Sequence, residues 1–129
     1  MPSASSMQVL IVDDQQSMRE LLRHCLKEIG VTKVTSTKSG EDALETVTKE
    51  SFDLIISDWN MDGMSGLDLL RSIRKNPVIK GLPFIMATGT QDKKQVLAAK
   101  EAGANNYIVK PFSTGDLRKR VEAVFGALS

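Results

Sequence analysis

The chain has 129 residues, of which 41% are hydrophobic and 26% are charged, which predicts one globular domain with a core of its own. Its 17 basic and 16 acidic residues give a net charge of +1, so no overall field favours direct binding to nucleic acid or to an anionic membrane. The single cysteine, Cys25, excludes an internal disulfide and a cysteine-based zinc cluster. No apolar stretch approaches the length of a membrane span and no signal peptide is visible, so we expect a cytoplasmic protein.

After a small, polar opening at residues 1–6, which we expect to be a flexible leader, residues 7–129 carry the pattern of a single domain. Strand-like and helix-like segments alternate along it, which is typical of an α/β fold with helices on both faces of a parallel sheet. The predicted strands lie at about 9–12, 34–37, 54–57, 84–87 and 106–109. The predicted helices lie at about 17–29, 40–50, 66–75, 93–102 and 114–128.

The first predicted helix has the clearest apolar face, at spacings of three and four residues. That face consists of Met18, Leu21, Leu22, Cys25, Leu26 and Ile29. Ser17 and Glu20 can form a capping box at its start, and Gly30 suits its end. The fourth predicted helix has a small, weak apolar face, and such sparse packing makes it a candidate for a mobile element.

Four of the apolar runs end directly on polar residues, which in chain order are Asp13 with Asp14, Asp58, Thr88 and Lys110. In a parallel sheet the carboxyl ends of the strands lie at one edge, and ligands bind at that edge. Three carboxylates, a hydroxyl and an ammonium are therefore predicted to converge on one small site.

Three carboxylates so close together are unstable unless a cation or a proton compensates them. Mg²⁺ fits best, because it prefers oxygen ligands and adds phosphate oxygens from a substrate. A carboxylate beside Mg²⁺ can attack phosphorus and form an aspartyl phosphate. Asp58 would then be the acceptor, Thr88 the hydroxyl donor and Lys110 the fixed cation. A cis peptide bond between Lys110 and Pro111 is an option that could set the direction of the lysine.

These segments resemble the receiver domain of response regulators, and within that family the CheY-like chemotaxis type. The resemblance is carried by Val12-Asp13-Asp14, Ser57-Asp58-Trp59-Asn60-Met61, Gly66-Leu67-Asp68-Leu69-Leu70, Ala87-Thr88 and Tyr107-Ile108-Val109-Lys110-Pro111-Phe112. These motifs span nearly the whole chain after the leader. The resemblance implies a flavodoxin-like, three-layer fold with a five-stranded parallel sheet in the order 2-1-3-4-5 and five helices.

The resemblance also implies a role for each matching residue at the acidic site. Asp58 matches the phosphoacceptor. Asp14 matches the direct ligand of Mg²⁺, and Asp13 matches its neighbour that acts largely through water. Asp58 itself and the backbone carbonyl of Asn60 complete the implied metal site.

The remaining matches concern the phosphoryl group and the switch. Thr88 and Lys110 match its two contacts, and Tyr107 matches the aromatic switch residue, whose ring moves inward when the Thr88 hydroxyl turns to the phosphate. Phosphorylation adds about −1.5 to −2 charge and new acceptor oxygens. The implied surface that partners read is formed by the fourth helix, the fifth strand and the fifth helix.

One segment departs from the family pattern. Asp62, followed by Gly63, stands where a proline commonly follows the methionine, so we expect a more flexible loop and an added carboxylate at the mouth of the site. Asn60 and Thr90 occupy positions that, in the family, tune how fast the phosphate is lost. We expect measurable autodephosphorylation.

The implied function is two-component signalling rather than enzymatic turnover of a substrate. A histidine kinase would phosphorylate Asp58, and the altered surface would bind a target protein, of which a flagellar motor switch component is the strongest family-level expectation; a phosphatase is a further partner to expect. Two alternatives use the same residues: a phosphorelay carrier that passes its phosphate to a histidine, and a receiver cut from a longer regulator.

Two other classes fit less well. A Mg²⁺-dependent phosphohydrolase usually has a second carboxylate two residues after its nucleophile, where this chain has Asn60. A flavodoxin-like flavin binder needs a loop of Ser, Thr or Gly after its first strand, where this chain has Asp-Asp-Gln-Gln at 13–16.

Other residues are interpreted as structural. Trp59 is either a binding aromatic or a side chain partly buried beside the site. His24 is predicted to be a surface residue and Cys25 a core residue. The run Arg118-Lys119-Arg120 is predicted to be a solvated turn of the last helix, on the expected binding face.

Overall fold

The computed structural model describes residues 3–89 and 93–128. In this part of the chain the strands form one parallel sheet in the order β2-β1-β3-β4-β5, which confirms the predicted α/β fold. The strands are β1 (Gln8–Val12), β2 (Lys33–Thr37), β3 (Leu54–Asp58), β4 (Phe84–Thr88) and β5 (Asn106–Val109). The helices are α1 (Gln16–Ile29), α2 (Gly40–Lys49), α3 (Gly66–Lys75), α4 (Lys93–Glu101) and α5 (Thr114–Phe125), preceded by one 3-10 turn, η1 (Ala4–Ser6).

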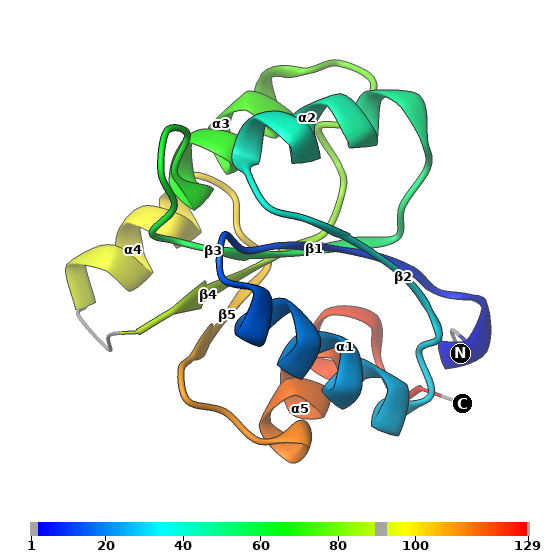
Figure 1. The fold of residues 1–129 in the computed structure, drawn as a ribbon. Coiled ribbons are helices and arrows are strands. Elements are labelled where there is room, and N and C mark those ends of the chain that lie inside the picture. Colours follow the sequence, from blue (N-terminus) through cyan, green and yellow to red (C-terminus); the bar gives the residue numbers. More distant parts are fainter. Residues whose placement is uncertain (1–2, 90–92, 129) are drawn as a thin grey trace.

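Helices cover both faces of the sheet, with α1 and α5 on one side and α2, α3 and α4 on the other (Figure 1). The side chains of β1 alternate between two separate hydrophobic clusters. Val9 and Ile11 belong to the cluster under α1 and α5, whereas Leu10 and Val12 belong to the cluster under α2, α3 and α4. Because a central strand is buried on both faces, its sequence is a continuous apolar run rather than an alternating one.

The start of α1 differs from the prediction, because the capping box expected at Ser17 does not form. The N-cap position is taken by Gln15, two residues before Ser17, and the helix begins at Gln16. The carboxylate of Asp13 accepts the Gln15 N–H at 2.9 Å, so a residue of the predicted site defines the start of the helix. Its end is as predicted, since Gly30 adopts the left-handed conformation with φ of +108°, which glycine accepts without strain.

Capping boxes occur instead at the starts of α3 and α5. Ser65 and Asp68 bond reciprocally to each other's backbone N–H at α3, and Ser113 and Asp116 do the same at α5. In both boxes the third helical residue is aspartate rather than the more usual glutamate. A search of the sequence for glutamate at this position therefore misses them.

The apolar face of α1 is confirmed except at its margin. Leu22, Cys25, Leu26 and Ile29 are buried, whereas Leu21 is 38% exposed. At 100° per residue Leu21 lies at the edge of the apolar stripe, where it can reach the core on one side only. Within the described ranges every helix is too short or too polar to cross a bilayer.

The packing of α4 and of the first residues is also informative. Ala99 is the buried residue of α4, and Leu97 is 55% exposed, so the predicted weak packing of this helix is confirmed. Ala4, in η1, is 3% exposed and belongs to the core cluster under α1 and α5. How freely residues 1–6 move in solution stays a prediction.

Arg74 on α3 connects two loops to the body of the domain. Its guanidinium donates to the carbonyls of Lys80 (2.9 Å) and Leu82 (2.7 Å) in the segment before β4. It also donates twice to the carbonyl of Gly103 (2.8 and 3.1 Å) and once to the Asn105 side chain (3.1 Å) before β5. A single planar, five-donor group thus satisfies acceptors from both segments.

We expect Arg74→Ala to lower the free energy of unfolding by about 2–3 kcal/mol, since four acceptors lose a charged donor. Urea denaturation followed by circular dichroism measures this. Arg71→Ala, on an exposed position of the same helix, is the matched control and should change stability by less than about 0.5 kcal/mol. Equal losses in the two variants would contradict the role given to Arg74.

Candidate functional site

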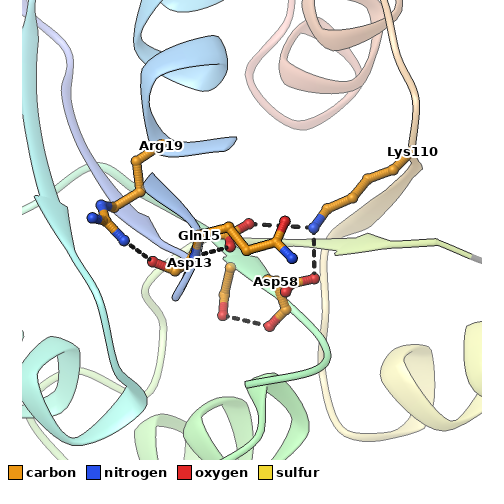
Figure 2. A network of polar contacts seen from close by, with 6 residues as sticks. Asp13, Gln15, Arg19, Asp58 and Lys110 are labelled. Atoms are coloured by element: carbon orange, nitrogen blue, oxygen red, sulfur yellow. Dashed lines mark hydrogen bonds and ion pairs between the residues drawn. The ribbon is translucent and has the colours of Figure 1, made fainter. Parts of the chain in front are cut away.

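The carboxyl ends of β1, β3 and β5 bring Asp13, Asp58 and Lys110 together (Figure 2). Lys110 Nζ lies 2.8 Å from Asp58 Oδ1 and 3.2 Å from Asp13 Oδ2. Asp13 is 0% and Asp58 7% exposed. One ammonium therefore contacts two buried carboxylates that would otherwise repel each other.

Asp14 adds a third carboxylate, on the exposed side of the same site. One oxygen each from Asp13, Asp14 and Asp58 lie within 4.8 Å of one another. Mg²⁺ binds oxygen at about 2.1 Å, which places opposite ligands about 4.2 Å apart, so small movements would let these carboxylates surround the ion. Asn60, two residues after Asp58, is exposed. That its backbone carbonyl binds the metal stays a prediction.

The backbone and side chain of Asp13 are held from several directions. The carboxylate of Asp13 accepts hydrogen bonds from the Gln15 N–H and the Lys110 ammonium. Its backbone carbonyl oxygen accepts a hydrogen bond from Arg19 Nη1 at 2.7 Å (Figure 2). Its own N–H donates to the Thr37 carbonyl of β2 at 3.2 Å. No sequence signal pointed to Arg19, because its contact is with a backbone atom and depends on how α1 lies over the sheet.

Asp58 is held by close backbone packing. The Ser57 hydroxyl donates to the Asp58 carbonyl at 3.0 Å, and the Gly66 N–H closes the following loop on the Trp59 carbonyl at 2.9 Å. A Cβ at position 66 would overlap the Asp58 carbonyl oxygen. Glycine is therefore required where α3 begins, although the backbone there does not need a positive φ.

Thr88 ends β4 and is 3% exposed. Its hydroxyl donates to Gln95 Oε1 on α4 at 3.3 Å, a partner that sequence reasoning missed because nothing in a helical glutamine indicates such a contact. The peptide bond between Lys110 and Pro111 is cis. Thr90, the expected tuning residue, lies outside the described residues.

Tyr107 on β5 is half-buried and packs against the cluster under α2, α3 and α4. Arg120 Cζ of α5 lies 4.8 Å from the centre of its ring. The predicted solvated turn at Arg118 to Arg120 is therefore wrong for Arg120, which is half-buried. Two residues rotate a helix by about 200°, so Arg118 points away and lies 3.6 Å from Glu122.

A groove of about 1160 Å³ runs between α4, β5 and α5. It is lined by Lys93, Val96, Leu97, Lys100, Tyr107, Ile108, Val109, Lys110, Pro111, Asp116, Lys119, Arg120 and Ala123. Five of these residues are basic and one is acidic, so the groove is electropositive. Its apolar lining includes the exposed Leu97.

The other interpreted residues can be placed directly. His24 is exposed, with Nε2 3.0 Å from Glu28 Oε1, and Cys25 is buried, as predicted. Trp59 is half-buried against the core, which is the structural alternative for this residue. Asp62 is exposed, and Gly63 has a φ of +75°, a conformation that favours glycine.

Comparison with known proteins identifies the class. The chain matches the response regulator receiver domain over residues 9–122. It is 39% identical over 119 residues to the chemotaxis protein CheY of Pseudomonas aeruginosa, which covers 92% of this chain and 96% of the relative. It is 38% identical over 123 residues to CheY-3 of Vibrio cholerae serotype O1, which covers 95% of each.

A solved structure supports the same family. The chemotaxis protein CheY4 of Vibrio cholerae superposes with a TM-score of 0.85 at 34% identity, over 92% of this chain and 98% of that one. The chain therefore belongs to the response-regulator receiver family of two-component signalling. Within that family it is a CheY-like receiver domain, as the sequence motifs predict.

Burial raises the pKa of the Asp58 carboxyl, because the charged form is removed from water; the ammonium of Lys110 opposes this, and the charge of Asp13 adds to it. Between its ordinary pKa and this raised pKa, the folded chain keeps a proton that the unfolded chain has lost. Stability due to Asp58 therefore falls as the pH rises through that window.

We expect Asp58→Asn to stabilise the metal-free protein, because an amide carries no charge to desolvate. The gain should be absent below about pH 3, where both states hold the proton, should grow as the pH rises from the ordinary pKa to the raised pKa, and should then level off. Urea denaturation of both proteins in EDTA at several pH values measures it. Asp62→Asn, which removes an exposed carboxylate of the same loop, should leave stability nearly unchanged. A loss of stability in Asp58→Asn at neutral pH would contradict this account.

Proposed function

We propose that a histidine kinase phosphorylates this receiver on Asp58 in a Mg²⁺-dependent reaction, and that the phosphoryl group changes the α4–β5–α5 face. The observation that supports the proposal most strongly is the position of Lys110, whose Nζ contacts Asp13 and Asp58. An oxygen of Asp14 lies within 4.8 Å of an oxygen of each of these two carboxylates. This combination of two buried carboxylates, one exposed carboxylate and one ammonium suits phosphoryl transfer better than any purely structural role.

In the proposed transfer, a carboxylate oxygen of Asp58 attacks phosphorus, and the bond from phosphorus to the donor's histidine nitrogen breaks. Asp14, Asp58 and the Asn60 carbonyl would hold Mg²⁺, with Asp13 acting through water. When bound, the ion supplies positive charge that offsets the phosphoryl oxygens. The residues fit this ion, because every ligand offered is a hard oxygen.

The side chains of the chain then act on the phosphoryl group. The Lys110 ammonium already reaches the acceptor oxygen and would neutralise a phosphoryl oxygen beside it. The low exposure of Asp58 limits the access of water. Thr88 can donate its hydroxyl to a second phosphoryl oxygen once it leaves Gln95, and Tyr107 can then take up the space that Thr88 vacates.

We further propose a role in chemotaxis, with a flagellar motor switch component as the target in the cytoplasm and loss of phosphate by autodephosphorylation or with a phosphatase. The similar proteins from Pseudomonas and Vibrio are chemotaxis proteins. The basic groove between α4 and α5 suits an acidic segment of the target, because opposite charges steer association and select partners.

Acetyl phosphate with Mg²⁺ should add one phosphoryl group to the wild-type chain, as measured by intact-mass spectrometry. Asp58→Asn should gain none, since the acceptor carboxylate is missing, and EDTA should prevent labelling of the wild type. Asp62→Asn keeps the acceptor and should be labelled like the wild type. Equal labelling of Asp58→Asn and wild type would refute phosphorylation on Asp58.

Capture of the chain by the flagellar switch protein of the same organism should increase after acetyl phosphate treatment. Lys119→Glu, which reverses a charge in the groove, should weaken capture by about threefold to fivefold. Lys27→Glu makes the same change on an exposed position of α1 and should have no effect. Capture that does not change after acetyl phosphate treatment would count against the motility role. It would not bear on phosphorylation of Asp58, which intact-mass spectrometry tests separately.

A further inference from the structure

Arg120 makes a set of contacts that the acidic site does not explain. The residue is half-buried on α5 and lines the groove together with Tyr107. Tyr107 lies on β5, an edge strand of the sheet, so a side chain of α5 can reach its ring around the open edge. The role of Tyr107 as the switch residue belongs to the proposed function, and the inference below rests on it.

The guanidinium of Arg120 covers one face of the Tyr107 ring, with Cζ 4.8 Å from the ring centre. A planar cation at this distance is attracted by the negative face of the aromatic ring. The contact is half-buried, so water weakens it less than it would on an open surface. Any ring position that leaves this contact loses the attraction.

Asn106 keeps Arg120 in this place. Arg120 Nη1 donates to Asn106 Oδ1 at 3.2 Å, and Asn106 Nδ2 donates to the Arg120 carbonyl at 3.5 Å. The same Asn106 Oδ1 accepts the N–H of Tyr107 at 2.8 Å. One asparagine side chain therefore ties the α5 backbone, the guanidinium and the backbone of the tyrosine to one another.

Among the described residues, no carboxylate forms an ion pair with Arg120, although the charge of Asp116 attracts it. Lys93, Lys100, Lys110 and Lys119 line the same groove and repel a guanidinium. Asp116 lies one turn earlier on α5, and its carboxylate accepts the Ser113 N–H in the capping box. Within the described part of the chain, the ring of Tyr107 and the Asn106 side chain are thus the direct contacts of the Arg120 guanidinium.

We propose that Arg120 is a positioning residue of the switch, which holds the Tyr107 ring in the place seen in this structure. Without the guanidinium, the ring populates its alternative position more often even in the unphosphorylated protein. A single cation–π contact of this kind corresponds to about a twofold to fivefold change in that population.

Tyr107 is the single tyrosine of the chain, so ring-selective isotope labelling of tyrosine gives NMR signals from this residue alone. Relaxation dispersion of the ring signals, recorded without phosphodonor, measures the population of the minor ring position. Arg120→Gln should raise this population about twofold to fivefold, and Arg120→Lys, which keeps a cation near the ring, should restore most of the wild-type value. Arg118→Gln, on the same helix but facing Glu122, should match the wild type.

The proposal is overturned if Arg120→Gln gives the same minor population as Arg118→Gln, or if Arg120→Lys behaves like Arg120→Gln. Adding Mg²⁺ and beryllium fluoride, a phosphoryl mimic, to the wild-type protein provides a separate test of the switch itself. Ring signals that do not move under these conditions would refute the switch role of Tyr107. The comparison of the three variants in the absence of the mimic would still report whether Arg120 positions the ring.

Discussion

The structure depends on one electrostatic constraint, the like charges of Asp13 and Asp58 at the same edge of the sheet. Lys110 lies between them, 3.2 Å from one carboxylate and 2.8 Å from the other. The three residues follow or end three different strands, so the network forms only when the sheet is complete. Because desolvating such a network costs about as much as its attraction returns, it is better explained by the chemistry of the site than by stability.

The same residues determine how the neighbouring elements are placed. The carboxylate of Asp13 accepts the N–H of Gln15 and so defines where α1 begins. The carbonyl of Asp58 leaves no room for a side chain at Gly66, where α3 begins. Two helices, one on each face of the sheet, therefore start at points that the site residues define, and the acidic residues are held by backbone as well as by charge.

The contacts that lead away from the site run to α4 and α5. Thr88 bonds to Gln95 on α4, and Tyr107 lies under Arg120 of α5; these two helices border the basic groove. With Ala99 as its buried residue, α4 anchors little apolar surface, so its movement loses little hydrophobic stabilisation. In the proposed function, a change of charge at Asp58 can thus reach the groove with little loss of buried apolar surface.

The sequence by itself determined the order and type of the elements, because strands buried on both faces are continuous apolar runs and helices repeat every three to four residues. It also determined that the acidic residues and Lys110 meet, since the carboxyl ends of parallel strands share one edge. The start of α1 was missed because a tertiary contact from Asp13 replaced the expected cap. Only the tertiary structure decided the partners Arg19, Gln95 and Arg120. Each reaches Asp13, Thr88 or Tyr107 from a helix, and the way a helix lies against the sheet depends on the whole packed core rather than on local pattern.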